Sequence, residues 1–226
     1  MYFLHGSTGD APQTATALKD DLDQASAQLD DPPIVVFPTY YPDRSFVRSN
    51  YVADAVLNQY FAIEELPKQL MPLVEKSFSV YSSSDPHSSR YRAFGGFSMG
   101  AITTWYVLRF QPQLFDTYLP LAGDAWVPQT GKTASSQSEQ GHALVDAVVR
   151  AREAAGMSAS EVRILVGAGK NDSTMNAMTP QVQAFSESDK FSSKNIEFYA
   201  VPSEGHSLGA LRGALTHYFE RIFSQS

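Results

Sequence analysis

The sequence contains no cysteine among its 226 residues. This absence excludes disulfide bonds, a thiol nucleophile and thiolate-bound metal ions, although it does not decide the compartment. Basic residues are also scarce, because 17 Lys and Arg face 24 Asp and Glu, which gives a net charge of −7. Nucleic acids and anionic membranes bind basic surfaces, so we expect neither of them as a partner.

Several other features are missing. No apolar run approaches the length of a membrane-spanning helix. No cluster of His, Asp and Glu has ligand spacing and no glycine loop fits a phosphate, so we expect no metal and no cofactor. The start lacks a charged segment followed by an apolar one, so no signal peptide is expected. Tyr2-Phe3-Leu4 already has the pattern of a buried strand. Such an opening indicates either a trimmed chain or a fold without its first strands, and we favour trimming.

Short apolar runs alternate with longer helical patterns along the chain. This order predicts an α/β fold with a mostly parallel sheet and helices on both faces. The length suits a single domain over residues 1–226. We expect strands at 2–4, 34–37, 92–94, 117–121, 163–166 and 196–201, and helices at 15–29, 58–78, 99–109, 142–155, 180–188 and 208–223. Pro67 and Pro72 should break or kink the second helix.

Gly96-Phe97-Ser98-Met99-Gly100 is the most informative motif of the chain. It lies between a predicted strand and a predicted helix, as does the nucleophile elbow of α/β-hydrolases. There a serine occupies a strained turn, and small flanking residues let strand and helix pack closely. The motif predicts that Ser98 is a nucleophile.

A serine hydroxyl needs an imidazole to accept its proton and a carboxylate to hold that imidazole. In α/β-hydrolases these partners follow in the order Ser, acid, His, each at the carboxyl end of a strand. Asp172 and His206 follow the strands predicted at 163–166 and 196–201. Asp124 is a rival acid because it also follows a strand, and a helix cap is the alternative role for Asp172.

An acyl-transfer site also needs donors for the oxyanion. The backbone N–H of Met99, just after the nucleophile, is one predicted donor. The second comes from the loop after the first strand, where Ser7 is the first choice and Thr8 the alternative. His5 lies at the start of this loop, and we expect it to brace the loop rather than to transfer protons.

The run from Tyr91 to Ala101 resembles the nucleophile segment of the feruloyl and acetyl xylan esterases of carbohydrate esterase family 1, relatives of esterase D. Further matching stretches lie at 4–6, 38–41, 103–107, 119–126, 167–172 and 204–206. The resemblance implies an α/β-hydrolase fold, a Ser98–His206–Asp172 triad, and an oxyanion hole of the Met99 and Ser7 amides. Members of that family normally have strands ahead of the Leu4-His5-Gly6 loop, and this chain does not.

The resemblance also implies a substrate class, namely ester-linked ferulate or acetate on plant cell-wall arabinoxylan. It favours a secreted protein and one module of a larger enzyme. A flat feruloyl group needs an aromatic slot, which Trp126, Tyr40 and Tyr41 could line, with ordinary packing as their alternative role. The stretch 128–140 could fold over the site as a partial lid.

The leading interpretation is therefore a serine ester hydrolase that releases ferulate or related cinnamates through an acyl-enzyme. Its expected partner is a small-molecule or polysaccharide ester. An acetyl xylan esterase comes second, and a thioester or S-formylglutathione hydrolase third. Two alternatives differ in class: a non-catalytic protein of this fold that binds carbohydrate or a protein, and an acyl transferase to a sugar.

Overall fold

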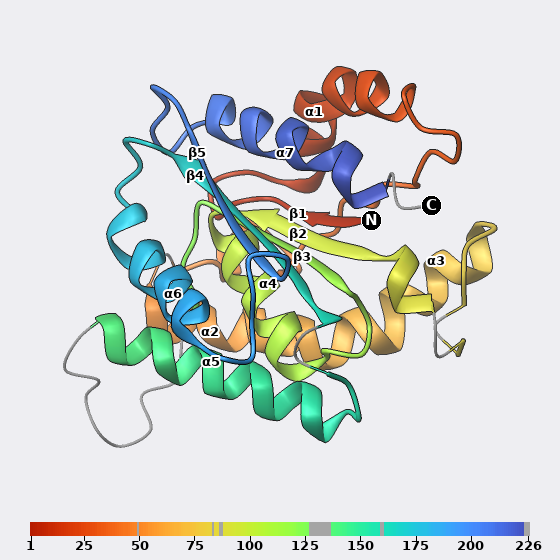
Figure 1. The fold of residues 1–226 in the computed structure, drawn as a ribbon. Coiled ribbons are helices and arrows are strands. Elements are labelled where there is room, and N and C mark those ends of the chain that lie inside the picture. Colours follow the sequence, from red (N-terminus) through yellow and green to blue (C-terminus); the bar gives the residue numbers. More distant parts are fainter. Residues whose placement is uncertain (49, 83, 86–87, 127–136, 159–160, 224–226) are drawn as a thin grey trace.

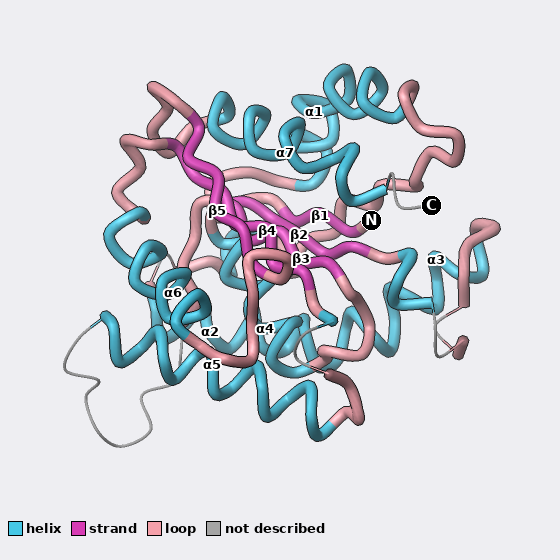
Figure 2. Tube along the Cα trace, in the orientation of Figure 1, coloured by secondary structure: helices cyan, strands magenta, loops and turns pink. Residues whose placement is uncertain are grey.

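The computed structural model describes residues 1–48, 50–82, 84–85, 88–126, 137–158 and 161–223. Within these residues, five strands form one parallel sheet in the order β1-β2-β3-β4-β5 (Figures 1 and 2). The strands are β1 (Tyr2–Leu4), β2 (Ala93–Phe97), β3 (Thr117–Leu121), β4 (Arg163–Gly169) and β5 (Ile196–Val201). Each strand pairs with its neighbour in sequence, and the chain crosses over through helices, as parallel pairing requires. The predicted α/β fold with a parallel sheet is confirmed.

Successive residues of each strand enter two different cores, because side chains alternate across a strand. Tyr2 and Leu4 belong to one apolar cluster, whereas Phe3 between them belongs to the other. The same alternation separates Ile164 from Leu165 in β4. Helices cover both faces of the sheet, so the strand side chains on each face must be apolar. This explains the continuous apolar runs in the sequence.

The helices divide between the two faces of the sheet (Figure 1). One face carries α1 (Ala11–Ser26) and α7 (Leu208–Phe223), which pack on each other. The other carries α2 (Tyr51–Tyr60), η2 (Phe61–Leu70), α3 (Met71–Ser77), α4 (Met99–Phe110), α5 (Gln137–Ala154) and α6 (Met175–Glu187). Short 3₁₀ turns, η1 (Arg44–Phe46) and η3 (Ser88–Tyr91), complete the described elements. Among the helices, α4 packs directly on β1, β2 and β3. It therefore holds the end of β2 in place between its two neighbouring strands.

The helix predicted at 58–78 differs most from the structure. It begins seven residues earlier, at Tyr51, and its middle part η2 is wound as a π-helix that contains Pro67. Proline has no N–H to donate, and in an α-helix its ring clashes with the carbonyl four residues before it. Wider turns relieve this clash without ending the helix. Pro72 lies in the first turn of α3, where a missing N–H is tolerated.

Three other elements also need correction. Residues 34–37 make only an isolated bridge, in which Val36 pairs with Tyr2 beside β1, instead of a full strand. The helix predicted at 180–188 begins at Met175, so Pro180 lies inside α6. The helix α1 begins at Ala11 because the Asp10 carboxylate accepts a hydrogen bond from the Gln13 N–H (2.8 Å), a cap that the prediction missed.

Candidate active site

Ser98 occupies the sharp turn between β2 and α4. Its φ of 56° and ψ of −114° lie in a region that L-residues avoid, at a cost of about 1–3 kcal/mol. The turn is held because the Ser98 N–H donates to the Leu121 carbonyl (2.8 Å) and its carbonyl accepts from the Ala101 N–H (2.9 Å). Gly100 brings this turn against β1, since a Cβ there would lie 2.5 Å from the Leu4 carbonyl oxygen. Ser98 and the loop after β1 are therefore fixed to each other.

Asp172 lies just beyond the end of β4 and is 4% exposed. One carboxylate oxygen accepts from both the backbone N–H and the hydroxyl of Thr174, at 2.9 and 2.8 Å. These bonds compensate the burial of the carboxylate and orient its second oxygen. Sequence reasoning missed Thr174, although a Thr two residues after an Asp is a recognisable turn signal.

His206 follows β5 on a loop that is tied to the Asp172 loop. The N–H groups of Lys170 and Asn171 donate to the carbonyls of Val201 and Glu204, at 2.9 and 2.8 Å. A Cβ at Gly169 would overlap the carbonyl oxygens of Glu204 and Gly205, so the two loops touch through their backbones. The ring of His206 also lies 4.8 Å from that of Phe97, centroid to centroid.

The structure brings the three predicted residues together in one hydrogen-bonded chain. His206 Nδ1 lies 2.8 Å from a carboxylate oxygen of Asp172, and His206 Nε2 lies 2.9 Å from Ser98 Oγ. An ionised carboxylate can only accept, so Nδ1 donates to it and the Nε2 lone pair faces the Ser98 hydroxyl. The rival acid Asp124 does not take this position, and burial raises the pKa of its carboxyl.

The two segments that carry the predicted oxyanion donors both lie next to Ser98. Met99 is the first residue of α4, so its N–H has no acceptor within the helix and carries the helix's partial positive charge. Ser7 lies in a turn closed by the Gly9 N–H, which donates to the Gly6 carbonyl (3.1 Å). A Cβ at Gly6 would lie 3.2 Å from Ser98 Cβ, which places this turn directly beside the nucleophile.

His5 braces the loop from within. It is 1% exposed, and its ring nitrogens lie 2.7 Å from the Gly6 carbonyl oxygen and 2.9 Å from the Thr39 hydroxyl. Burial lowers the pKa of His5. The rings of Tyr40 and Tyr41 pack on it with centroids 5.2 and 5.1 Å away.

The burial of Tyr40 and Tyr41 favours their alternative role, ordinary packing, over a place in an acyl slot. They are 1% and 6% exposed, so both belong to the core under the loop and offer no open ring face. The Tyr41 hydroxyl instead donates to the Gly9 carbonyl at 2.7 Å. A buried aromatic support could not be told from an aromatic contact surface in the sequence, because the two use the same residue types.

Trp126 is partly buried against the core at the end of the segment that follows β3. Its carbonyl accepts from an Arg109 guanidinium N–H at 3.1 Å. Most of the predicted lid at 128–140 lies outside the described residues, which end at 126 and resume at 137. Its last part, Gln137 to Gln140, forms the first turn of α5 and is not loop.

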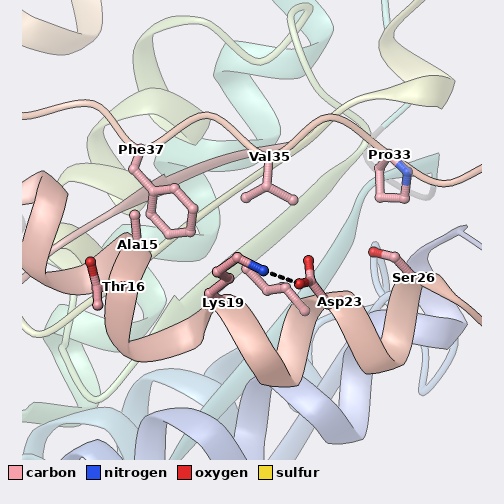
Figure 3. A pocket seen from close by; sticks show the side chains of 9 residues that line it. Ala15, Thr16, Lys19, Asp23, Ser26, Pro33, Val35 and Phe37 are labelled. Carbon is pink, nitrogen blue, oxygen red and sulfur yellow. Dashed lines mark hydrogen bonds and ion pairs between the residues drawn. The ribbon is translucent and has the colours of Figure 1, made fainter.

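A groove lies elsewhere, between α1 and residues 33–37 (Figure 3). It holds about 470 Å³; the Lys19–Asp23 ion pair lies along it, with Val35 and Phe37 opposite. Among the described residues that line it, none belongs to the hydrogen-bonded chain of Ser98. In the part of the chain that the structure describes, no group of three metal-ligating side chains occurs, and no helix is long and apolar enough to cross a membrane.

Comparisons with known proteins agree with this geometry. The family model described as "Putative esterase" matches residues 1–220. Endo-1,4-beta-xylanase Y of Acetivibrio thermocellus is 28% identical in an alignment 240 residues long, which covers 97% of this chain but only 20% of that protein. The chain thus spans about a fifth of the length of this curated relative.

Solved structures give the same result. The feruloyl esterase module from Clostridium thermocellum, complexed with sinapinate, superposes with a TM-score of 0.72 and 25% identity over 95% of this chain and 74% of that one. A ferulic acid esterase of Anaeromyces mucronatus superposes with a TM-score of 0.67 and 19% identity, over 98% and 77% of the two chains. The second likeness shows the fold alone. By the family match over nearly its whole length, the chain belongs to the esterase family of α/β-hydrolase fold.

Proposed function

We propose that the protein is a serine carboxylic-ester hydrolase that acts through an acyl-enzyme. Its proposed substrates are esters of ferulate and related hydroxycinnamates on plant cell-wall arabinoxylan. One observation carries the proposal: Ser98, His206 and Asp172 form a continuous hydrogen-bonded chain of 2.9 and 2.8 Å. A serine hydroxyl needs this arrangement to become a nucleophile at neutral pH.

The first half-reaction forms the acyl-enzyme. Ser98 Oγ attacks the ester carbonyl carbon while His206 Nε2 takes the hydroxyl proton, and the carbonyl oxygen becomes an oxyanion. The N–H groups of Met99 and Ser7 donate to that oxyanion, and one such donor is worth roughly 10²- to 10³-fold in kcat. The intermediate then collapses, the bond to the alcohol oxygen breaks, and His206 gives its proton to that oxygen. The acyl group remains on Ser98.

The second half-reaction releases the acid. A water molecule attacks the acyl carbon as His206 takes one of its protons, which forms a second oxyanion at the same two donors. When this intermediate collapses, His206 returns the proton to Ser98 Oγ, and the carboxylic acid leaves. Asp172 accepts from Nδ1 throughout and stabilises the imidazolium that forms twice in each cycle.

Two observations support a large aromatic ester as the substrate. The chain is 25% identical to a feruloyl esterase module whose structure contains sinapinate, a hydroxycinnamate. The side chain of His206 is 39% exposed, so the reacting end of the chain is open to a bulky alcohol such as a polysaccharide. Trp126, at the end of the segment after β3, is the proposed aromatic contact for the acyl group.

Labelling with a fluorophosphonate tests the mechanism. We expect one adduct, located on Ser98, and no adduct on Ser98→Ala. An intact protein that stays unlabelled and inactive on every ester would favour the non-catalytic alternative. The substrate class is tested by comparing kcat/KM for methyl ferulate, acetylated xylan and an S-acyl thioester. A preference for acetylated xylan or for the thioester would replace the feruloyl assignment.

A substitution at Trp126 tests the acyl contact. Trp126→Ala should raise KM for methyl ferulate by roughly tenfold, which corresponds to about 1.4 kcal/mol of lost binding, and change KM for a small acetate ester less. Trp126→Phe, which keeps an aromatic ring, is the matched control and should retain most of the affinity. Equal changes for both esters would remove Trp126 from the acyl site.

A further inference from the structure

Gln181 of α6 makes an unusual contact with the backbone. Its carboxamide oxygen accepts from the Ala125 N–H at 2.8 Å, and its carboxamide N–H donates to the Ala125 carbonyl at 2.9 Å. Both polar backbone groups of one residue are thus paired with a single side chain. Gln181 is 2% exposed and Ala125 is 1% exposed, so water does not compete for these bonds.

The segment around Ala125 lies beside Ser98, the proposed nucleophile. A Cβ at Gly123 would lie 2.6 Å from the Ser98 carbonyl oxygen, so the backbone at Gly123 touches that of Ser98. The segment 123–126 is also held at both ends. The Trp105 indole N–H donates to the Gly123 carbonyl, and Arg109 donates to the Trp126 carbonyl, each at 3.1 Å. Gln181 supplies the middle support.

The helix α5 fixes the position of Gln181 itself. A Cβ at Gly141 of α5 would lie 2.8 Å from the Pro180 carbonyl oxygen and 3.2 Å from Gln181 Cα. The two helices therefore meet backbone to backbone at the residue that holds Ala125. A support built this way cannot shift by a rotamer change of a neighbouring side chain.

We propose that Gln181 is a positioning residue that sets the acyl specificity of the ester hydrolase by holding the segment 123–126 beside Ser98. The inference rests on the proposed function. Without the carboxamide, the buried N–H and C=O of Ala125 lose their partners, and the segment must move to regain hydrogen bonds. Trp126 moves with it. An acyl group that packs on this segment then binds less well, whereas a small acetyl group does not reach it.

The test replaces Gln181 by Met, which has nearly the same shape and makes neither hydrogen bond. Gln183→Met is the matched control, because Gln183 lies on the same helix with an exposed side chain bonded to Glu187 (2.7 Å). We expect kcat/KM for methyl ferulate to fall roughly 10- to 100-fold in Gln181→Met, mostly through KM, with 4-nitrophenyl acetate changed about threefold or less. Gln183→Met should match the parent. Equal losses on both esters, or no loss, would overturn the inference.

Hydrogen exchange gives a readout that does not depend on activity. The Ala125 amide should be protected in the parent and in Gln183→Met, and should exchange at least about tenfold faster in Gln181→Met, which corresponds to about 1.4 kcal/mol. If the Ala125 amide exchanged no faster in Gln181→Met than in the parent, the proposed support of this segment by Gln181 would be refuted. If the Met variant does not fold, Gln181→Glu keeps an acceptor for the Ala125 N–H and, when ionised, sets a second oxygen against the Ala125 carbonyl in place of the donor; it should shift both readouts in the same direction.

The two proposals can fail separately. A parent protein that neither labels at Ser98 nor hydrolyses any ester would refute the proposed function, while exchange at Ala125 would still test whether Gln181 holds the segment. An active parent in which Gln181→Met affects both esters alike would leave the hydrolase assignment intact and refute only the role of Gln181 in specificity.

Discussion

Gly100→Ala tests whether the backbone contact between the nucleophile turn and the loop after β1 sets the catalytic geometry. A Cβ at this position would lie 2.5 Å from the Leu4 carbonyl oxygen and 2.9 Å from that of His5. Both are backbone atoms in the middle of the fold, so neither can turn aside as a flexible side chain would. The alanine must push the first turn of α4 away from the end of β1.

The size of the displacement follows from these distances. Ordinary contacts of a Cβ begin near 3.4 Å, so the two segments must separate by about 0.9 Å. The proposed oxyanion donors, the N–H groups of Met99 and Ser7, lie on opposite sides of this contact. A misplacement of about 1 Å at a reacting centre can cost on the order of 10²-fold in rate. We therefore expect kcat/KM to fall by roughly two orders of magnitude, through kcat, because the donors act on the transition state.

Overpacking also lowers stability, by about 1–3 kcal/mol. Urea denaturation measures this loss, and ester hydrolysis by the folded variant measures the loss of kcat. Gly9→Ala in the same loop is the control, since its Cβ would have its nearest neighbour at 3.7 Å, an ordinary contact. It should stay within about 0.5 kcal/mol of the parent. A folded Gly100→Ala enzyme with the parent's kcat would refute the reasoning.

Three further predictions concern side chains around the site. Asp172→Asn should lower kcat by roughly 10⁴-fold, because an amide no longer holds the tautomer of His206; single-turnover hydrolysis checks this, and a loss under tenfold would contradict it. Tyr41→Phe removes the 2.7 Å bond to the Gly9 carbonyl and should cost about 1 kcal/mol in urea denaturation, whereas Tyr60→Phe on the exposed surface should cost nothing measurable. Burial lowers the pKa of His5 below its ordinary 6.5, so the unfolded state binds the proton first. The contribution of His5 to the free energy of unfolding should be complete above pH 6.5 and should fall as the pH drops from there toward the pKa of the folded state. In His5→Gln the free energy of unfolding should depend less on pH over this window. If it depended on pH equally in the two proteins, His5 would not contribute.

Local sequence patterns were sufficient to locate the strands of the central sheet, although β2 and β4 each end three residues later than predicted. β3, β5 and α7 have the predicted bounds, because apolar runs covered on both faces and an amphipathic helix leave clear local signals. Residues 34–37 have the same apolar pattern but pair only through a single bridge beside β1. Whether such a run forms a full strand depends on the segment that lies beside it at the edge of the sheet. The local sequence does not encode that neighbour.

The candidate site likewise contains some residues that could be predicted from the sequence and others that could not. Ser98, Asp172 and His206 could be found from their order and from the turns that follow strands, since chemistry restricts both residue type and position. Gln181 gave no signal, because a glutamine in a helix has no distinctive pattern until the helix is placed beside Ala125. For Tyr40 and Tyr41 the sequence left an acyl slot and ordinary packing open, because burial is a property of the assembled fold.

The hydrogen-bonded chain of Asp172, His206 and Ser98 is buried at Asp172 and partly exposed at His206. The Asp172 side chain is fully buried and accepts from both Thr174 groups as well as from His206, so its position is fixed on every side. The His206 ring at the other end is 39% exposed and leans on Phe97. A fixed carboxylate holds Nδ1, whereas Nε2 faces Ser98 Oγ on a ring that is partly open to solvent, where an alcohol can leave and water can enter. This asymmetry supports the proposed hydrolysis of a polymer-linked ester, because an enclosed site would exclude a polysaccharide that carried the acyl group.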